Sequence, residues 1–125
     1  MKKRYMLLMI AAFLVSGYIA FETTHNNSAS AQTNVSFAQD VQPILKSRCA
    51  TCHMGKAASG GLSMNSYESL MAGSDDGAVI VAGHAGQSYL VENITSGDMP
   101  KRGPKLTPGQ IQMIVDWINA GALNN

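Results

Sequence analysis

The chain has little charge and few residues of the kinds that mark a catalytic or nucleic-acid-binding protein. Among its 125 residues, nine Lys and Arg oppose eight Asp and Glu, giving a formal net charge of +1. A near-neutral chain lacks the basic surface on which nucleic-acid binding depends. No Ser/His/Asp pattern, catalytic pair of carboxylates or phosphate-binding loop is recognisable. Asp75 and Asp76 do not form such a pair, because they are adjacent in a turn-forming segment. Nucleic-acid binding and hydrolytic catalysis are therefore not favoured.

No uncharged run reaches the ~20 apolar residues that a membrane-spanning helix prefers. The apolar run from Met6 to Phe21 follows the basic group Lys2-Lys3-Arg4, which is the pattern of an export signal. Ala29-Ser30-Ala31 is a candidate cleavage site. The polar stretch before this site is long for a signal peptide, so a retained membrane anchor formed by residues 5–21 is the alternative. In either case we expect export to the periplasm or to the outer face of the cytoplasmic membrane.

This pattern divides the chain into three parts. Residues 1–31 are the signal peptide or N-terminal membrane anchor, residues 32–36 are a tether, and residues 37–125 form one folded domain. A domain of that size buries only a modest apolar core and often needs a covalent or metal staple.

The only two cysteines lie in the pentapeptide Cys49-Ala50-Thr51-Cys52-His53. This C-x-x-C-H spacing is the attachment signature of a c-type haem. Thiols three residues apart on one helical turn face the same side, where they can add to the two vinyl groups of one porphyrin, and His53 then offers its imidazole to the iron. Half of a zinc site and a disulfide are the alternatives, although zinc usually takes four protein ligands and no second C-x-x-C or H-x-x-x-H exists.

Apolar spacing and capping residues predict an all-α domain of three to five short helices. The first spans roughly Phe37 to Ala50, with Ser36 and Gln39 as a capping pair, although Pro43 favours a later start. The apolar run Val79-Ile80-Val81 is expected to pack against the porphyrin edge, since no partner strand is predicted.

Three further helices are predicted. The residues that begin them are Ser66, for a helix over Tyr67 to Ala72; Ser88, for a helix over about Tyr89 to Thr95; and Thr107 with Pro108, for the last helix. In the last helix we expect a buried stripe with Trp117 at its edge, formed by Ile111, Ile114, Val115 and Ile118.

The second ligand of the iron decides between two kinds of protein. An iron held by His53 alone binds small molecules, whereas a second protein ligand favours an electron carrier. Met99 is the favoured ligand because it lies in irregular chain, and Pro100 biases it to extended geometry. His84 is the main rival, although a lone loop histidine is more often exposed. Less favoured are Met54, which adjoins His53, Met64 and Met71 in the core, Met113 as a packing residue, and His25 before the domain.

In this order, the motifs resemble class I c-type cytochromes, and most closely the small exported monohaem domain of the planctomycete type. The segments that carry the resemblance are Asp40-Val41-Gln42-Pro43-Ile44-Leu45, the pentapeptide, Gly60-Gly61-Leu62, Ser88-Tyr89-Leu90, Met99-Pro100, Leu106-Thr107 and Gly121-Ala122. It implies a cytochrome c fold wrapped round one covalently bound haem c, attached at Cys49 and Cys52, with His53 and Met99 as axial ligands. Family members often read Met-Pro-Pro, whereas here Lys101 follows Pro100.

The expected function is one-electron transfer in a respiratory or related chain, by a carrier and not an enzyme. The alternatives are a haem subunit anchored in a larger redox complex and a five-coordinate haem protein that reacts with gases or peroxide. Lys101, Arg102 and Lys105 lie beside Met99 and predict a basic collar that steers an acidic redox partner. Pairing of Arg102 with a haem propionate and a merely solvated loop are the other interpretations.

Overall fold

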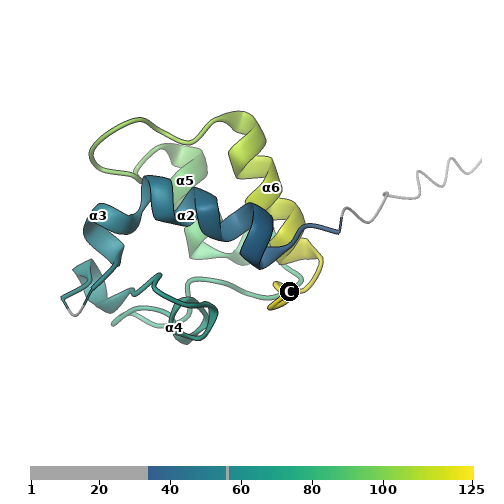
Figure 1. Cartoon of the computed structure of the whole chain (residues 1–125), viewed down its shortest axis with the longest axis horizontal. Helices are drawn as coiled ribbons and strands as arrows, with labels where there is room; N and C mark the ends of the chain where they lie inside the picture. The colour runs from purple at the N-terminus through teal and green to yellow at the C-terminus, as the bar shows by residue number, and fades with distance from the viewer. Residues whose placement is uncertain (1–33, 56) are drawn as a thin grey trace, which may run out of the picture.

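The computed structural model describes residues 34–55 and 57–125, which contain five α-helices and no strand (Figure 1). The expected signal or anchor, its cleavage site, His25 and the first two tether residues lie outside the described residues. In chain order the elements are the π-helical turn η1 (Phe37–Val41), α2 (Gln42–Arg48), α3 (Ala50–His53), the 3-10 turn η2 (Ser59–Gly61), α4 (Tyr67–Ala72), the 3-10 turn η3 (Ala85–Gln87), α5 (Tyr89–Ser96) and α6 (Pro108–Asn119).

The first predicted helix is interrupted, which corrects the expectation of one run from Phe37 to Ala50. The Ser36 side chain caps the start by accepting a hydrogen bond from Gln39 N. Pro43 is accommodated because η1 is a separate wide turn, so that the proline falls in the first turn of α2. At Cys49 the backbone leaves the helix with φ −118° and ψ −20°. The C-x-x-C-H motif therefore occupies its own short helix, α3.

Helices α4 and α6 form where capping residues predict them. Each begins with a capping box, made by Ser66 and Ser69 in α4 and by Thr107 and Gln110 in α6. Helix α5 also starts as predicted, but Ser88 makes no capping bond through its side chain. Its hydroxyl instead accepts from Val81 N (2.9 Å) and donates to His84 O (3.1 Å). These bonds fasten the preceding loop, which explains why the buried serine is satisfied without capping the helix.

The core lies between η1, α4 and α6, and Trp117 is at its centre. The spacing had predicted Trp117 at the edge of the α6 stripe. This prediction was wrong, because the residue is fully buried. Its ring lies 5.3 Å from that of Phe37 and 6.4 Å from that of Tyr67, centroid to centroid. The indole Nε1 donates to Leu123 O at 2.9 Å. Met113, expected to pack, faces outward with 37% of its surface exposed.

Helix packing sets the position of α5 relative to α2 and α3. Helix α5 contacts α6, and α6 contacts η1, so the core holds α5 at a fixed position relative to α2 and α3. The connection from α5 to α6 extends on the side of the molecule where α3 lies (Figure 1). Among the helices of the described part of the chain, none has the length and apolar character needed to cross a membrane.

Candidate functional site

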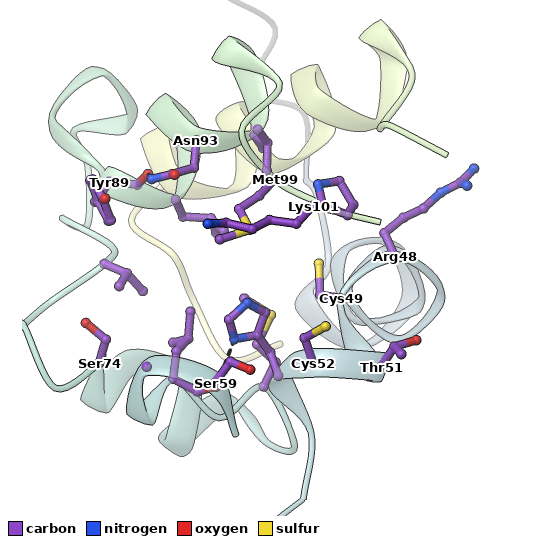
Figure 2. A pocket seen from close by; sticks show the side chains of 18 of the residues that line it. Arg48, Cys49, Thr51, Cys52, Ser59, Ser74, Tyr89, Asn93, Met99 and Lys101 are labelled. Atoms are coloured by element: carbon purple, nitrogen blue, oxygen red, sulfur yellow. Dashed lines mark hydrogen bonds between the residues drawn. The ribbon is translucent and has the colours of Figure 1, made fainter. Parts of the chain in front are cut away.

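A cavity of about 640 Å³ separates α3 from α5 and the loop that follows α5 (Figure 2). Its volume lies in the range typical of cofactor sites. Much of its lining is apolar, contributed by Leu62, Met64, Val79, Leu90, Ile94 and Met99. Val79 thus reaches the cavity as expected for the run Val79-Ile80-Val81, whereas Ile80 is buried in the core and Val81 is 37% exposed.

One wall carries the C-x-x-C-H motif. Cys49, at the break between α2 and α3, is half-buried and Cys52 is exposed; both are free thiols that line the cavity. Burial, with a smaller contribution from Cys52, raises the pKa of the Cys49 thiol to about 11. Cys49 is therefore protonated at neutral pH. Two thiols three residues apart can add to the two vinyl groups of one porphyrin.

The imidazole of His53 is oriented by a backbone carbonyl. Its Nδ1 lies 3.3 Å from Leu62 O, and because a carbonyl can only accept, Nδ1 carries the proton. The Nε2 lone pair is then free to bind a metal, which is the arrangement that histidine ligands usually show. The chain returns beside the histidine, where Met64 N donates to His53 O at 2.7 Å. This hydrogen bond holds the segment that contains Leu62 beside the imidazole ring of His53.

The opposite wall carries Met99. Helix α5 ends at Gly97, whose φ of 82° is a left-handed conformation that glycine adopts at little cost. The chain then turns so that Met99 N donates to Asn93 O at 3.0 Å. Figure 2 shows Met99 on the side of the cavity opposite Ser59 and Cys52. The structure therefore brings Cys49, Cys52, His53 and Met99 to one cavity.

The other sulfur and imidazole candidates are placed elsewhere or on the same wall as His53. His84 is exposed, with Nδ1 3.2 Å from Ala82 O, and does not line the cavity. Met54 and Met71 pack against the core. Met64 lines the cavity but is hydrogen bonded to His53 through its backbone. Met99 is thus the methionine that faces the cavity from the far wall.

The three cations of the predicted collar are not equivalent. Lys101 and Arg102 line the cavity, whereas Lys105 does not. The Lys105 ammonium donates to Pro100 O, which ties it to the loop. A collar at the cavity itself therefore comprises two of the three residues.

Sequence reasoning missed several polar residues of the lining: Arg48, Ser74, Asp76, Tyr89 and Asn93. Arg48 has a signal in the sequence, because it directly precedes the motif, and its buried Nε has no hydrogen-bond partner among the described residues. Asn93 lies one helical turn after Tyr89, which places both on one face of α5. The loop residues Ser74 and Asp76 have no comparable signal.

Zinc does not fit this donor set. Within residues 34–55 and 57–125 there is no group of three or more His, Cys, Asp or Glu side chains that could hold a metal ion. Two thiols and an imidazole on one wall, a thioether on the other and an apolar lining between them instead suit a flat, covalently held macrocycle with an axially ligated metal.

Residues 49–103 match the model of a protein family described as planctomycete cytochrome C. The chain is therefore similar to that family over this segment. The match spans the motif, the cavity loops, α5 and the Met99 loop, so it covers most of the residues that line the cavity. This similarity indicates a covalently bound haem c and a role in haem-based electron transfer, and it favours a carrier over an enzyme. No curated protein and no solved structure matches the chain in the corresponding comparisons.

Proposed function

We propose that the protein is a monohaem electron carrier whose iron is ligated by His53 and Met99 and whose haem is attached through Cys49 and Cys52. The observation that carries this proposal is the placement of these four residues on two facing walls of one cavity. When bound, the haem supplies one-electron redox chemistry at its iron.

The protein residues have distinct roles in this proposal. The two thiols hold the porphyrin covalently, so that it cannot dissociate after folding. The Leu62 carbonyl fixes the tautomer and orientation of His53. The bond from Met99 N to Asn93 O holds the thioether side of the cavity in place. Because a thioether donates weakly, ligation by His and Met raises the reduction potential.

We further propose that the carrier acts outside the cytoplasmic membrane in a respiratory or related chain. Support comes from the basic and apolar N-terminal pattern of residues 1–21 and from the haem attachment motif. Fractionation of cells, followed by sequencing of the N-terminus of the purified protein, separates a cleaved exported form from a form retained through residues 5–21. A protein found in the cytoplasm with an intact N-terminus would contradict this location.

The ligand assignment is tested by spectroscopy of Met99→Ala. The wild-type ferric protein should show the methionine-sulfur charge-transfer band in the red, and its reduced form should leave the Soret band unchanged under carbon monoxide. Met99→Ala should lose the red band and bind carbon monoxide. His84→Ala is the matched control, because His84 is exposed and away from the cavity. A wild-type protein that binds carbon monoxide would instead favour the gas- or peroxide-reactive class.

The expected partner is an acidic redox protein that docks beside Lys101, Arg102 and Lys105. All three residues are exposed, and two of them line the cavity. Exposed charges raise association rates through long-range attraction, which salt screens. The rate of electron transfer to an acidic partner should therefore fall as ionic strength rises. A rate indifferent to ionic strength would exclude the steering role.

A further inference from the structure

We propose that Lys101 is a positioning residue for the haem propionates and thereby an electrostatic determinant of the reduction potential. This inference rests on the proposed attachment through Cys49 and Cys52. It differs from the sequence-based hypothesis, which assigned propionate pairing to Arg102.

The two cysteines determine which way a bound haem points. A haem carries its vinyl groups and its propionates on opposite sides of the macrocycle. Attachment at Cys49 and Cys52 therefore directs the propionates to the far side of the cavity. Figure 2 shows Ser74 and Tyr89 on that side, across the cavity from both cysteines. Both residues line the cavity.

The polar groups on that side are mostly engaged already. The Ser74 hydroxyl donates to Gly77 O at 3.2 Å and accepts from Asp76 N at 3.2 Å. The Asn93 side-chain amide donates to Tyr89 O at 2.9 Å. Asp76 adds a carboxylate to the lining. Two propionates placed beside it need a compensating cation, because unpaired like charges repel at short range.

Lys101 meets that need by its position. It lines the cavity, and in Figure 2 its side chain runs from the Met99 loop across the cavity, toward the side where Tyr89 and Ser74 lie. The Tyr89 side chain, 57% exposed, supplies a phenolic hydroxyl on the same side. The Lys101 ammonium and the Tyr89 hydroxyl can both donate hydrogen bonds to a carboxylate.

The other cations are less well placed. The Lys105 ammonium is tied to Pro100 O. Arg48 lines the cavity next to Cys49, and Figure 2 shows it on the side of the cysteines, away from Ser74 and Tyr89. Arg102 lines the cavity and is exposed, so it is the rival that the experiment must separate from Lys101.

The test compares Lys101→Gln, Lys101→Arg and Arg102→Gln in the holoprotein, with Lys46→Gln as a charge-matched control. Lys46 is an exposed lysine of α2 that donates to Gln42 Oε1 and does not line the cavity. A nearby positive charge disfavours the more positive ferric iron. Lys101→Gln should therefore shift the redox equilibrium with a mediator dye about threefold toward oxidised haem. It should also displace the propionate bending band in resonance Raman spectra.

Lys101→Arg should restore both readouts, and Lys46→Gln should change neither. The inference is overturned if Lys101→Gln has the wild-type equilibrium and propionate band, or if Arg102→Gln alone changes them. A protein with no covalently bound haem in a pyridine haemochrome assay would refute the proposed function itself, and this inference with it. A normal haem spectrum with unaltered propionates refutes only the role of Lys101.

Discussion

Replacing Trp117 with Phe should destabilise the domain without affecting the proposed iron ligands. Trp117 is fully buried between Phe37 and Tyr67, from η1 and α4. It does not line the cavity. The substitution keeps an aromatic ring but removes the indole N–H and part of the ring volume. Its effect therefore reports on the core that holds α6 against η1, separately from the haem site.

The expected cost follows from two losses. Removal of the bond from Nε1 to Leu123 O costs about 1 kcal/mol, since exposed Leu123 lets water replace the donor. Loss of ring volume in a close-packed core adds about 1–2 kcal/mol through lost burial and a residual void. The free energy of unfolding should therefore fall by about 2–3 kcal/mol. Trp117→Ala, which empties the site, should cost at least about 3–5 kcal/mol.

Guanidinium denaturation followed by far-ultraviolet circular dichroism measures the effect. Tyr67→Phe is the comparison variant, because it removes only the bond from the phenol to Ala122 O at 2.7 Å and should cost about 1–2 kcal/mol. The native spectrum, including the red sulfur band, should be unchanged in both variants. A loss below about 0.5 kcal/mol in Trp117→Phe, or an altered red band, would refute the assignment of Trp117 to the scaffold.

Two further predictions concern helix ends. Thr107→Ala removes the hydroxyl that accepts a hydrogen bond from Gln110 N at 3.3 Å, and it should lower the free energy of unfolding by about 1 kcal/mol in thermal unfolding. The control Gln112→Ala removes only an exposed bond to Asp116 and should cost less than about 0.5 kcal/mol. Equal losses in the two variants would contradict the capping role of Thr107. In the first turn of α4, the backbone N–H of Glu68 and then the Ser66 hydroxyl lower the pKa of the Glu68 carboxyl below 4.5. This stabilisation is present above pH 4.5 and is lost as pH falls below it, so Glu68→Gln should flatten the acid limb of a pH–stability curve.

Capping residues were the most reliable guides to the fold. Thr107-Pro108 with Gln110, and Ser66, mark the starts of α6 and α4 because their hydrogen bonds involve only neighbours in the chain. Ser88 occupies an equivalent place before α5 but bonds the loop at Val81 and His84 instead. Its alternative partners become available only when the chain has folded, so local pattern cannot reveal them.

The position of Trp117 shows the same limit for packing. Helical periodicity places it at the edge of the stripe formed by Ile114 and Ile118. Its burial depends on Phe37, eighty positions earlier in the sequence, which supplies a facing ring 5.3 Å away. The break at Cys49 was also missed, because no glycine or proline marks it.

The two proposed iron ligands differ in how directly sequence specifies them. Cys49, Cys52 and His53 lie within five residues of one another, at the break before α3 and in α3 itself, so their proximity follows from the local sequence. Met99 becomes opposed to them only through the packing of α5 on α6 and of α6 on η1, together with the bond from Met99 N to Asn93 O. A perturbation of the α5–α6 contact should therefore weaken the methionine ligand before the histidine. This order is what the proposed attachment through Cys49 and Cys52, together with the fold-dependent position of Met99, requires.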